Sequence, residues 1–174
     1  MSTTPPVEAA AALATSWRLD PARSNVQFEV PHFWGLMTVK GSFSAYEGIL
    51  ALGDTPSVSL TIDAASVDTG QAKRDQHLRS RDFFNVEHHP TITFTSERAN
   101  LDGETLTVDG TLQVAAGRLA LTLAATLREE GEELEIEGST TVDHRQLGIV
   151  WSPLGVMRSP SVLRVNGRLV RQGP

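Results

Sequence analysis

The chain of 174 residues contains no cysteine. This excludes disulfides, thiolate nucleophiles and cysteine-based zinc or iron–sulfur sites, so the fold must be held together by packing. Basic residues are also outnumbered: 15 Lys and Arg stand against 21 Asp and Glu, a formal charge of −6. Because binding to a phosphate backbone depends on clustered Lys and Arg, we expect no nucleic-acid partner.

Long hydrophobic runs are missing too. No segment reaches the roughly 18 apolar residues of a membrane-spanning helix, so we expect no transmembrane segment. The first residues, MSTTPPVEAAAALATS, have neither the basic start nor the long apolar core of a signal peptide. We therefore expect residues 1–16 to be a disordered tail, residues 17–174 to form a single domain, and the protein to be cytoplasmic.

Strict alternation of apolar and polar residues dominates the rest of the chain. Val26, Phe28 and Val30 alternate with polar residues, which places the apolar side chains on one face of a strand. The same period of two recurs in seven further segments, at residues 39–45, 58–64, 92–94, 106–114, 119–127, 134–142 and 163–169. Turn residues separate these segments. The pattern predicts an all-β fold, an antiparallel closed barrel of about eight strands.

Four glycines fall on the inward parity of these segments: Gly41, Gly110, Gly138 and Gly167. A glycine in mid-strand packs nothing, so it marks either a bend or a place where another group approaches the backbone. Either use suits a barrel with a filled interior.

One stretch, GQAKRDQHLRSRDFF at residues 70–84, interrupts the alternation and is rich in helix-forming residues. It predicts one short helix between the third and fourth of the predicted strands. Pro90 disfavours helix at His89 and is tolerated at the start of a strand. The HHP sequence at residues 88–90 therefore indicates the passage from helix to strand.

The histidines do not form a metal-binding motif. His88 and His89 are adjacent, so in an extended chain their side chains point to opposite sides, and no HxH or HExxH spacing occurs. We expect no metal site.

Two alternatives to a binding protein stay open. A small enzyme would need the fold to bring together an acid–base set from His32, Asp82, His88, His144 and Arg145, because no phosphate loop, dinucleotide fingerprint or nucleophile elbow is present. A structural or interaction module without a ligand would instead have a solid core.

Three stretches carry a resemblance to a known family. SWRLDPARSNVQFEVPHFWGLMTVKGSF (16–43), HLRSRDFFNVEHHPTITFTS (77–96) and VDHRQLGI (142–149) resemble segments of the YceI-like family. The resemblance spans Trp17 to about Val170. It implies that residues 17–174 form a single YceI-like domain, a lipocalin-like antiparallel barrel that holds polyisoprenoid or quinone-type lipids in its interior and has no established chemistry.

We therefore predict a non-catalytic carrier of a long apolar lipid, a polyisoprenoid or isoprenoid quinone, with no other cofactor. Barrels of about eight strands can hold one such ligand. The residues expected to line the interior, each of which could equally be plain core, come from the inward parities: Phe28, Phe43, Leu60, Ile62, Ile92, Phe94, Leu112 and Leu123.

Two further predictions concern the barrel mouth. The loop 148–160 is too apolar for a solvated loop, so Trp151 and Met157 would cover the mouth and contact ligand, or form a homodimer contact. Arg145 would either meet a polar head group or form a salt bridge with Asp143 or Asp82.

Overall fold

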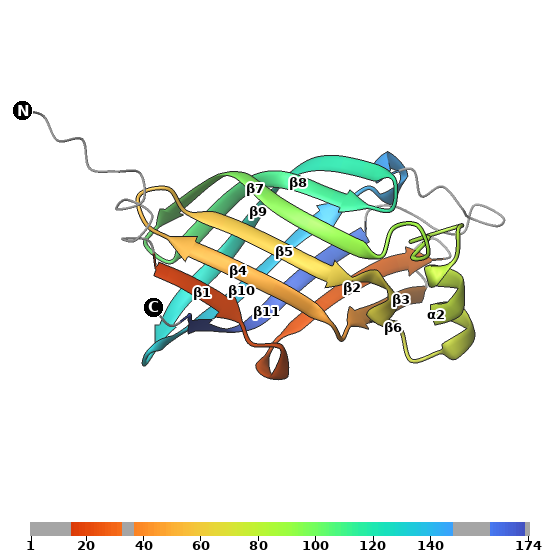
Figure 1. Cartoon of the computed structure of the whole chain (residues 1–174), viewed down its shortest axis with the longest axis horizontal. Coiled ribbons are helices and arrows are strands. Elements are labelled where there is room, and N and C mark those ends of the chain that lie inside the picture. The colour runs from red at the N-terminus through yellow and green to blue at the C-terminus, as the bar shows by residue number, and fades with distance from the viewer. Residues whose placement is uncertain (1–14, 33–36, 148–160, 173–174) are drawn as a thin grey trace, which may run out of the picture.

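The computed structural model describes residues 15–32, 37–147 and 161–172, and in these ranges the alternating segments form one antiparallel sheet (Figure 1). The strands are β1 (Thr15–Leu19), β2 (Asn25–His32), β3 (Met37–Phe43), β4 (Tyr46–Leu52), β5 (Ser57–Asp63), β6 (Val67–Asp68), β7 (Thr91–Asp102), β8 (Thr105–Val114), β9 (Gly117–Glu130), β10 (Glu133–Val142) and β11 (Ser161–Arg171). The helices are α2 (Ala72–Arg79) and three short 3-10 turns, η1 (Pro21–Arg23), η3 (Ala64–Ser66) and η4 (His144–Leu147). None of these helices is long and apolar enough to cross a membrane.

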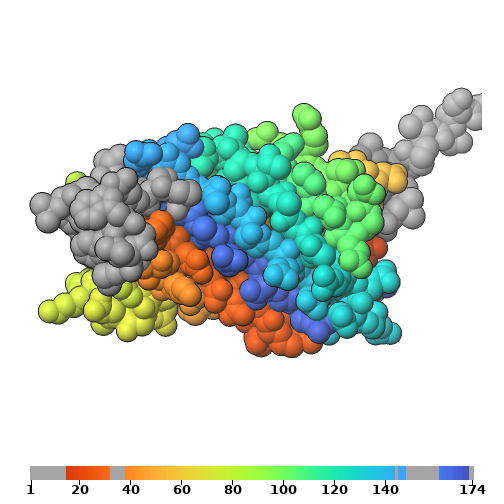
Figure 2. All heavy atoms as spheres, turned by 180° about the vertical axis from the view of Figure 1, so that it is seen from behind, coloured from red at the N-terminus to blue at the C-terminus, as the bar shows by residue number. Residues whose placement is uncertain are grey.

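The sheet closes into a barrel because β1 pairs with β11. Eight strands form the ring, in the order β1-β4-β5-β7-β8-β9-β10-β11 and back to β1. β11 pairs with β10 along one edge. Along its other edge, its last residues pair with β1 and its first half pairs with β2, to which β3 and β6 are added. From behind, β10, β11 and β2 lie side by side on the outer face (Figure 2). The predicted closed barrel of eight strands is confirmed.

The predicted place of the helix in the strand order is wrong. α2 falls inside the expected stretch of residues, but it follows β6 and does not lie between the third and fourth strands. The reason is that β1, β4 and β6 escaped the period-two pattern. β4 ends in the unbroken apolar run Ile49–Leu52, which hides its alternation, and β6 has two residues, too few to show any period. β1 also includes Thr15 and Ser16, so the strand begins inside the expected tail of residues 1–16.

Two of the inward glycines are covered by phenyl rings from neighbouring strands. A Cβ on Gly41 would lie 2.3 Å from Cζ of Phe28, which faces Gly41 across the β2–β3 pair. A Cβ on Gly110 would lie 2.6 Å from Cζ of Phe94 and 2.5 Å from the Thr95 carbonyl oxygen. The glycines are therefore places where another group approaches the backbone, and that group is a ring of the core.

The segment that follows α2 packs onto one end of the barrel. The guanidinium of Arg79 donates to the backbone carbonyls of Ala65 (2.8 Å) and Val67 (3.2 Å), which holds α2 against η3 and β6. The Phe84 ring packs against the rings of Phe28 and Phe43, with centroids 6.5 and 6.0 Å apart. We call this the α2 end, and we call the opposite end, formed by the turns at residues 53–56, 103–104 and 131–132, the hairpin end (Figure 1).

Candidate ligand cavity

The barrel interior contains a cavity of about 230 Å³. All eight residues predicted to line the interior border it: Phe28, Phe43, Leu60, Ile62, Ile92, Phe94, Leu112 and Leu123. That these side chains contact a ligand stays a prediction. In other proteins, apolar cavities of about 150 Å³ stay dry and accept a molecule of the size of benzene. The space here is large enough for part of an apolar chain.

The inward side chains are buried to different degrees on two sides of the barrel. On β8 the inward side chains of Leu106 and Val108 are buried, with 1% and 2% of their surface exposed, and those of Leu112 and Val114 are buried as well. On β9 the inward side chains alternate with exposed ones but are only half-buried: Leu119, Leu121, Leu123 and Ala125. The same is true of Ile136 on β10 and of Leu163 and Val165 on β11.

We call these two sides the β8 wall and the β9–β11 wall. Leu121, Leu123, Ile136, Leu163 and Val165 all border the cavity, and they point inward, so their remaining accessible surface faces it. Leu106, Val108, Leu112 and Val114 of the β8 wall border the cavity too, but they are more deeply buried.

Small residues explain why the inward side chains of the β9–β11 wall are less buried than those of the β8 wall. Gly138 of β10 faces Ala125 of β9 across the ladder, and a Cβ on Gly138 would lie 3.0 Å from the Ala125 Cβ. In the described parts of the chain, the atoms nearest to a Cβ on Gly138 belong to Ala124 and Ala125 and not to an aromatic ring, in contrast to Gly41 and Gly110. Because two small residues stand where the other walls carry phenyl rings, the β9–β11 wall leaves volume unfilled.

Polar groups are scarce in the lining. Thr140 and Ser161 lie on inward positions of β10 and β11 near the α2 end, and the Thr140 hydroxyl donates to the Thr122 carbonyl at 3.4 Å. The Arg164 side chain, by contrast, is on the outward parity of β11 and lies 3.8 Å from Glu29. The cavity therefore offers hydrophobic contact and little polar chemistry.

Two buried polar atoms have no hydrogen-bond partner among the described residues: Trp17 Nε1 and the Tyr46 hydroxyl. Burial raises the pKa of the Tyr46 phenol, and the negative charge of Asp20 adds to the effect. Neither residue borders the cavity. They belong to the packed part of the interior.

The acid–base set considered from the sequence is not assembled by its described members. Asp82 Oδ2 lies 3.1 Å from His77 Nε2, and His88 Nδ1 lies 3.2 Å from Asn85 Oδ1, so each has a local partner. The side chains of His32 and His144 lie outside the described parts. Within the described ranges, no three His, Asp or Glu side chains gather in a metal-binding arrangement.

Arg145 forms the predicted salt bridge with Asp143. Its Nε lies 3.1 Å from Asp143 Oδ1 and its side chain is exposed, so it does not reach the cavity. The ion pair raises the pKa of the Arg145 guanidinium. Trp151 and Met157, predicted to cover the mouth, lie outside the described residues.

Several lining residues lie outside the set predicted from the sequence. Ile136, Leu163 and Val165 have the inward parity that selected the other residues, so parity could have found them. Leu78 and Phe84 also border the cavity, but they come from the α2 end, where no strand period exists. Their only signal was the apolar character of positions 78, 83 and 84 in a polar stretch.

Comparison with known proteins agrees with this geometry. The family model described as YceI-like domain matches residues 17–166. A UPF0312 protein of Pectobacterium atrosepticum is 35% identical over 131 residues, which cover 72% of this chain and 68% of the relative.

Two solved structures show the same fold. The crystal structure of BcnA from Burkholderia cenocepacia superposes with a TM-score of 0.79 at 18% identity, covering 87% of this chain and 99% of that one. A polyisoprenoid binding domain from Saccharophagus degradans, implicated in plant cell wall breakdown, gives a TM-score of 0.70 at 15% identity, with 90% and 98% covered. Family match, sequence identity and barrel architecture agree, and this chain belongs to the YceI-like family.

Proposed function

We propose that this protein is a non-catalytic carrier that holds one long apolar lipid, a polyisoprenoid or an isoprenoid quinone, inside its barrel. The observation that carries the proposal is the cavity, whose described lining is almost wholly aliphatic and aromatic. The binding domain from Saccharophagus degradans, which shares the fold, supports a polyisoprenoid as the ligand class.

Hydrophobic transfer is sufficient to drive binding. Each CH₂ group moved from water into an apolar site contributes about 0.8 kcal/mol, so a few isoprene units supply a large gross free energy. The ordering of the chain and of the side chains around it offsets part of this. Affinity should therefore rise with chain length until the cavity is filled.

Among the described residues, the polar side chains considered for catalysis do not enter the cavity. His77, His88, Asp82 and Arg145 are engaged in local pairs at the surface. A head group of the ligand would meet Thr140 and Ser161 first, since these are the inward polar side chains near the α2 end.

Native mass spectrometry of the protein purified from its own source tests the proposal. We expect an added mass that organic extraction releases and identifies as an isoprenoid lipid. Protein that carries no such mass, and that takes up no isoprenoid alcohol or quinone when these are added, would contradict the carrier role and favour a structural module.

A further inference from the structure

We infer that residues 70–89 form a hinged cap, and that the lipid enters and leaves the barrel when this cap opens. We call this segment the cap; it consists of α2 and the turns that follow it, at the α2 end of the barrel (Figure 1). The inference rests on the proposed function, because an interior that carries a ligand needs an entrance. It adds the route of entry and the contacts that hold the entrance closed.

The cap is held together by its own backbone. Among the described residues, its backbone-to-backbone hydrogen bonds join positions within the segment: Phe84 N donates to the Leu78 carbonyl at 2.9 Å, and Val86 N donates to the Arg79 carbonyl at 3.1 Å. The cap lies between the end of β6 and the start of β7, so no described ladder ties it to the sheet. A segment of this kind can open as a unit while the barrel stays intact.

The guanidinium of Arg79 is the polar contact that holds the cap closed. Its Nε donates to the Ala65 carbonyl at 2.8 Å, and its Nη2 donates to the Val67 carbonyl at 3.2 Å. Both acceptors precede the cap and belong to η3 and β6. A hydrogen bond that involves a charged group contributes about a factor of ten or more to an equilibrium constant, so Arg79 governs how often the cap opens.

The apolar side chains of the cap form part of the cavity wall. Leu78 is the one large apolar side chain of α2, whose sequence is AKRDQHLR. Leu78 and Phe84 are half-buried, Phe83 is buried, and all three border the cavity. The Phe84 ring packs against Phe28 and Phe43, which line the cavity from β2 and β3. Displacing the cap would therefore uncover the cavity lining at this end.

The cap joins the barrel through Gly70 and Pro90. Gly70 has a φ of 80°, in the left-handed region, and a Cβ placed on it would meet no atom of the described residues within 4 Å. Glycine in open space suits a hinge, because its φ and ψ angles change at low cost. Pro90 is fixed to the barrel, since its carbonyl accepts from Ala64 N at 3.0 Å. The cap can thus swing while its far end stays attached.

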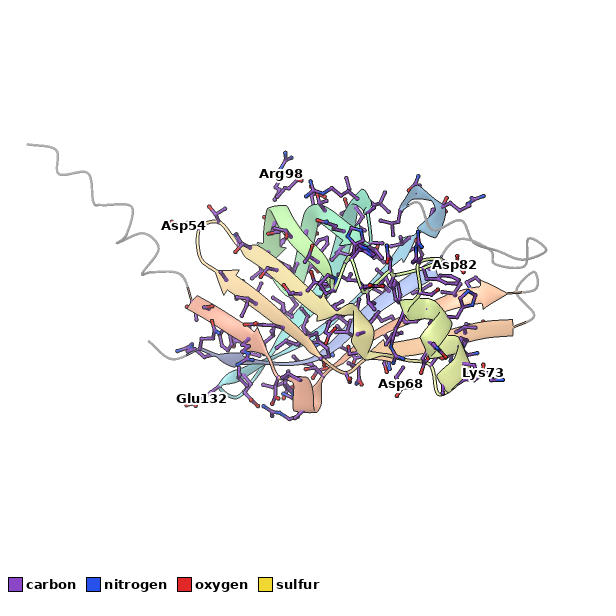
Figure 3. All side chains as sticks on the ribbon, turned by 45° about the vertical axis from the view of Figure 1, so that its right-hand side comes forward. Asp54, Asp68, Lys73, Asp82, Arg98 and Glu132 are labelled. Carbon is purple, nitrogen blue, oxygen red and sulfur yellow. The ribbon has the colours of Figure 1, made fainter. Side chains whose placement is uncertain are left out.

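The hairpin end offers no comparable entrance in the described part of the chain. Its turns join consecutive strands, and the ladders continue up to them, as where Asp102 pairs with Thr105. Opening that end would break ladder hydrogen bonds, whereas opening the cap would not. Figure 3 shows the two ends: Lys73 and Asp82 mark the cap, and Glu132 marks the hairpin end.

Two matched crosslinks test the cap. The chain has no cysteine, so an introduced pair of thiols can be joined selectively by a short bismaleimide. Ala65→Cys with Arg79→Cys places one thiol on the barrel and one on the cap, at positions that the Arg79 guanidinium bridges. Glu104→Cys with Arg128→Cys is the control at the hairpin end, where Arg128 Nε lies 3.8 Å from Glu104 Oε2.

Stopped-flow fluorescence of the isoprenoid alcohol retinol measures exchange. Before crosslinking, the first double variant lacks the Arg79 contacts, so uptake and release should both be about tenfold faster than in the parent. The Kd should change little, because the cap opens in the empty and the loaded protein alike. After crosslinking, both rates should fall about tenfold or more below those of the parent. The control should match the parent in both states.

Retinol exchange as fast in the crosslinked cap variant as in the parent, or equal slowing by the two crosslinks, would overturn the inference. Hydrogen exchange of the parent gives a second readout: the amides of the cap should exchange together and faster than those of β8 and β9, and equal protection would also overturn it. The carrier role is scored separately. A parent that takes up neither retinol nor solanesol in native mass spectrometry would contradict the carrier role itself and, with it, any entrance for lipid.

Discussion

The two walls of this barrel are built from the same alternating pattern and both border the cavity, yet the inward side chains of the β8 wall are buried and most of those of the β9–β11 wall are only half-buried. On the β8 wall, inward Leu and Val side chains are buried, and the rings of Phe28 and Phe94 lie over glycines of neighbouring strands. On the β9–β11 wall, inward Leu, Ile and Val side chains remain half-buried around Gly138 and Ala125. The difference shows that a cavity in a barrel depends on which small residues are left uncovered.

The largest difference in stability between the two walls should come from adding one methyl group to a glycine that a ring covers and to one that faces an alanine. Gly110→Ala should destabilise the fold by about 3 kcal/mol or more, because the new Cβ would meet the Thr95 carbonyl and the Phe94 ring, and interiors packed to crystal density cannot absorb such overlap. Gly138→Ala is the matched control. Its Cβ needs a shift of only a few tenths of an ångström at Ala125, so the expected cost is about 1 kcal/mol or less.

Urea unfolding of both variants measures this difference. Similar losses of stability at Gly110 and Gly138 would mean that the β9–β11 wall is packed as tightly as the rest of the interior.

The next largest difference in stability should come from placing a tryptophan at a buried and at a half-buried position of the cavity lining. Ile62 is buried on β5, so Ile62→Trp should cost about 1–3 kcal/mol through overpacking. Leu123 on β9 also borders the cavity but is only half-buried, so Leu123→Trp should leave the thermal stability of the lipid-free protein near that of the parent and remove most of its uptake of a long isoprenoid. Thermal melts and native mass spectrometry on lipid-stripped protein provide both readouts, and early unfolding of the Leu123 variant would count against the cavity.

The β9–β11 wall also depends on ion pairs on its outer face, and acid should reveal this. Arg23 contacts both Asp20 and Glu133, and its guanidinium lowers the pKa of each carboxyl below its usual range. A carboxyl with a lowered pKa in the folded state contributes stability that is present at neutral pH and is lost as the pH falls through that pKa. Between about pH 6 and about pH 3, the parent should therefore lose more stability than Arg23→Gln.

The acid effect is modest because Arg23 is exposed and Asp20 and Glu133 are only partly buried, so solvent screens their interaction. Urea midpoints at the two pH values compare the parent with the variant, and amide exchange should show added opening in β10 but not in β8. Parallel pH profiles for the two proteins would show that this cluster contributes nothing.

The smallest expected change in stability concerns Tyr46, which does not border the cavity. The Tyr46 hydroxyl is buried without a hydrogen-bond partner among the described residues, and a buried unsatisfied donor costs free energy. Tyr46→Phe removes that group while keeping the ring. We expect unchanged stability or a gain of up to about 1 kcal/mol in thermal or urea unfolding. A clear loss would mean that the hydroxyl has a partner.

Much of the fold could be predicted from the sequence, because a period of two is a direct consequence of strand geometry. It predicted the inward faces of β2, β3, β5 and β7 to β11 and all eight interior residues, which border the cavity. β4 and β6 were missed because an apolar run or a length of two residues carries no alternation.

The asymmetry of the interior could not be predicted in the same way. Parity says that Gly41, Gly110 and Gly138 all point inward, but it does not say that Phe28 and Phe94 cover the first two and that Ala125 faces the third. Cross-strand register decides this, and register depends on the pairing of strands that are distant in the chain.

Photocrosslinking with a diazirine-bearing isoprenoid chain tests the central claim most directly. After loading, irradiation and proteolysis, mass spectrometry should locate the labels on the β9–β11 wall, at Leu121, Leu123, Ile136 and Leu163. Leu106 and Val108 also border the cavity but are buried, so they should carry fewer labels. Labels spread equally over the two walls, or confined to the outer surface, would contradict the account.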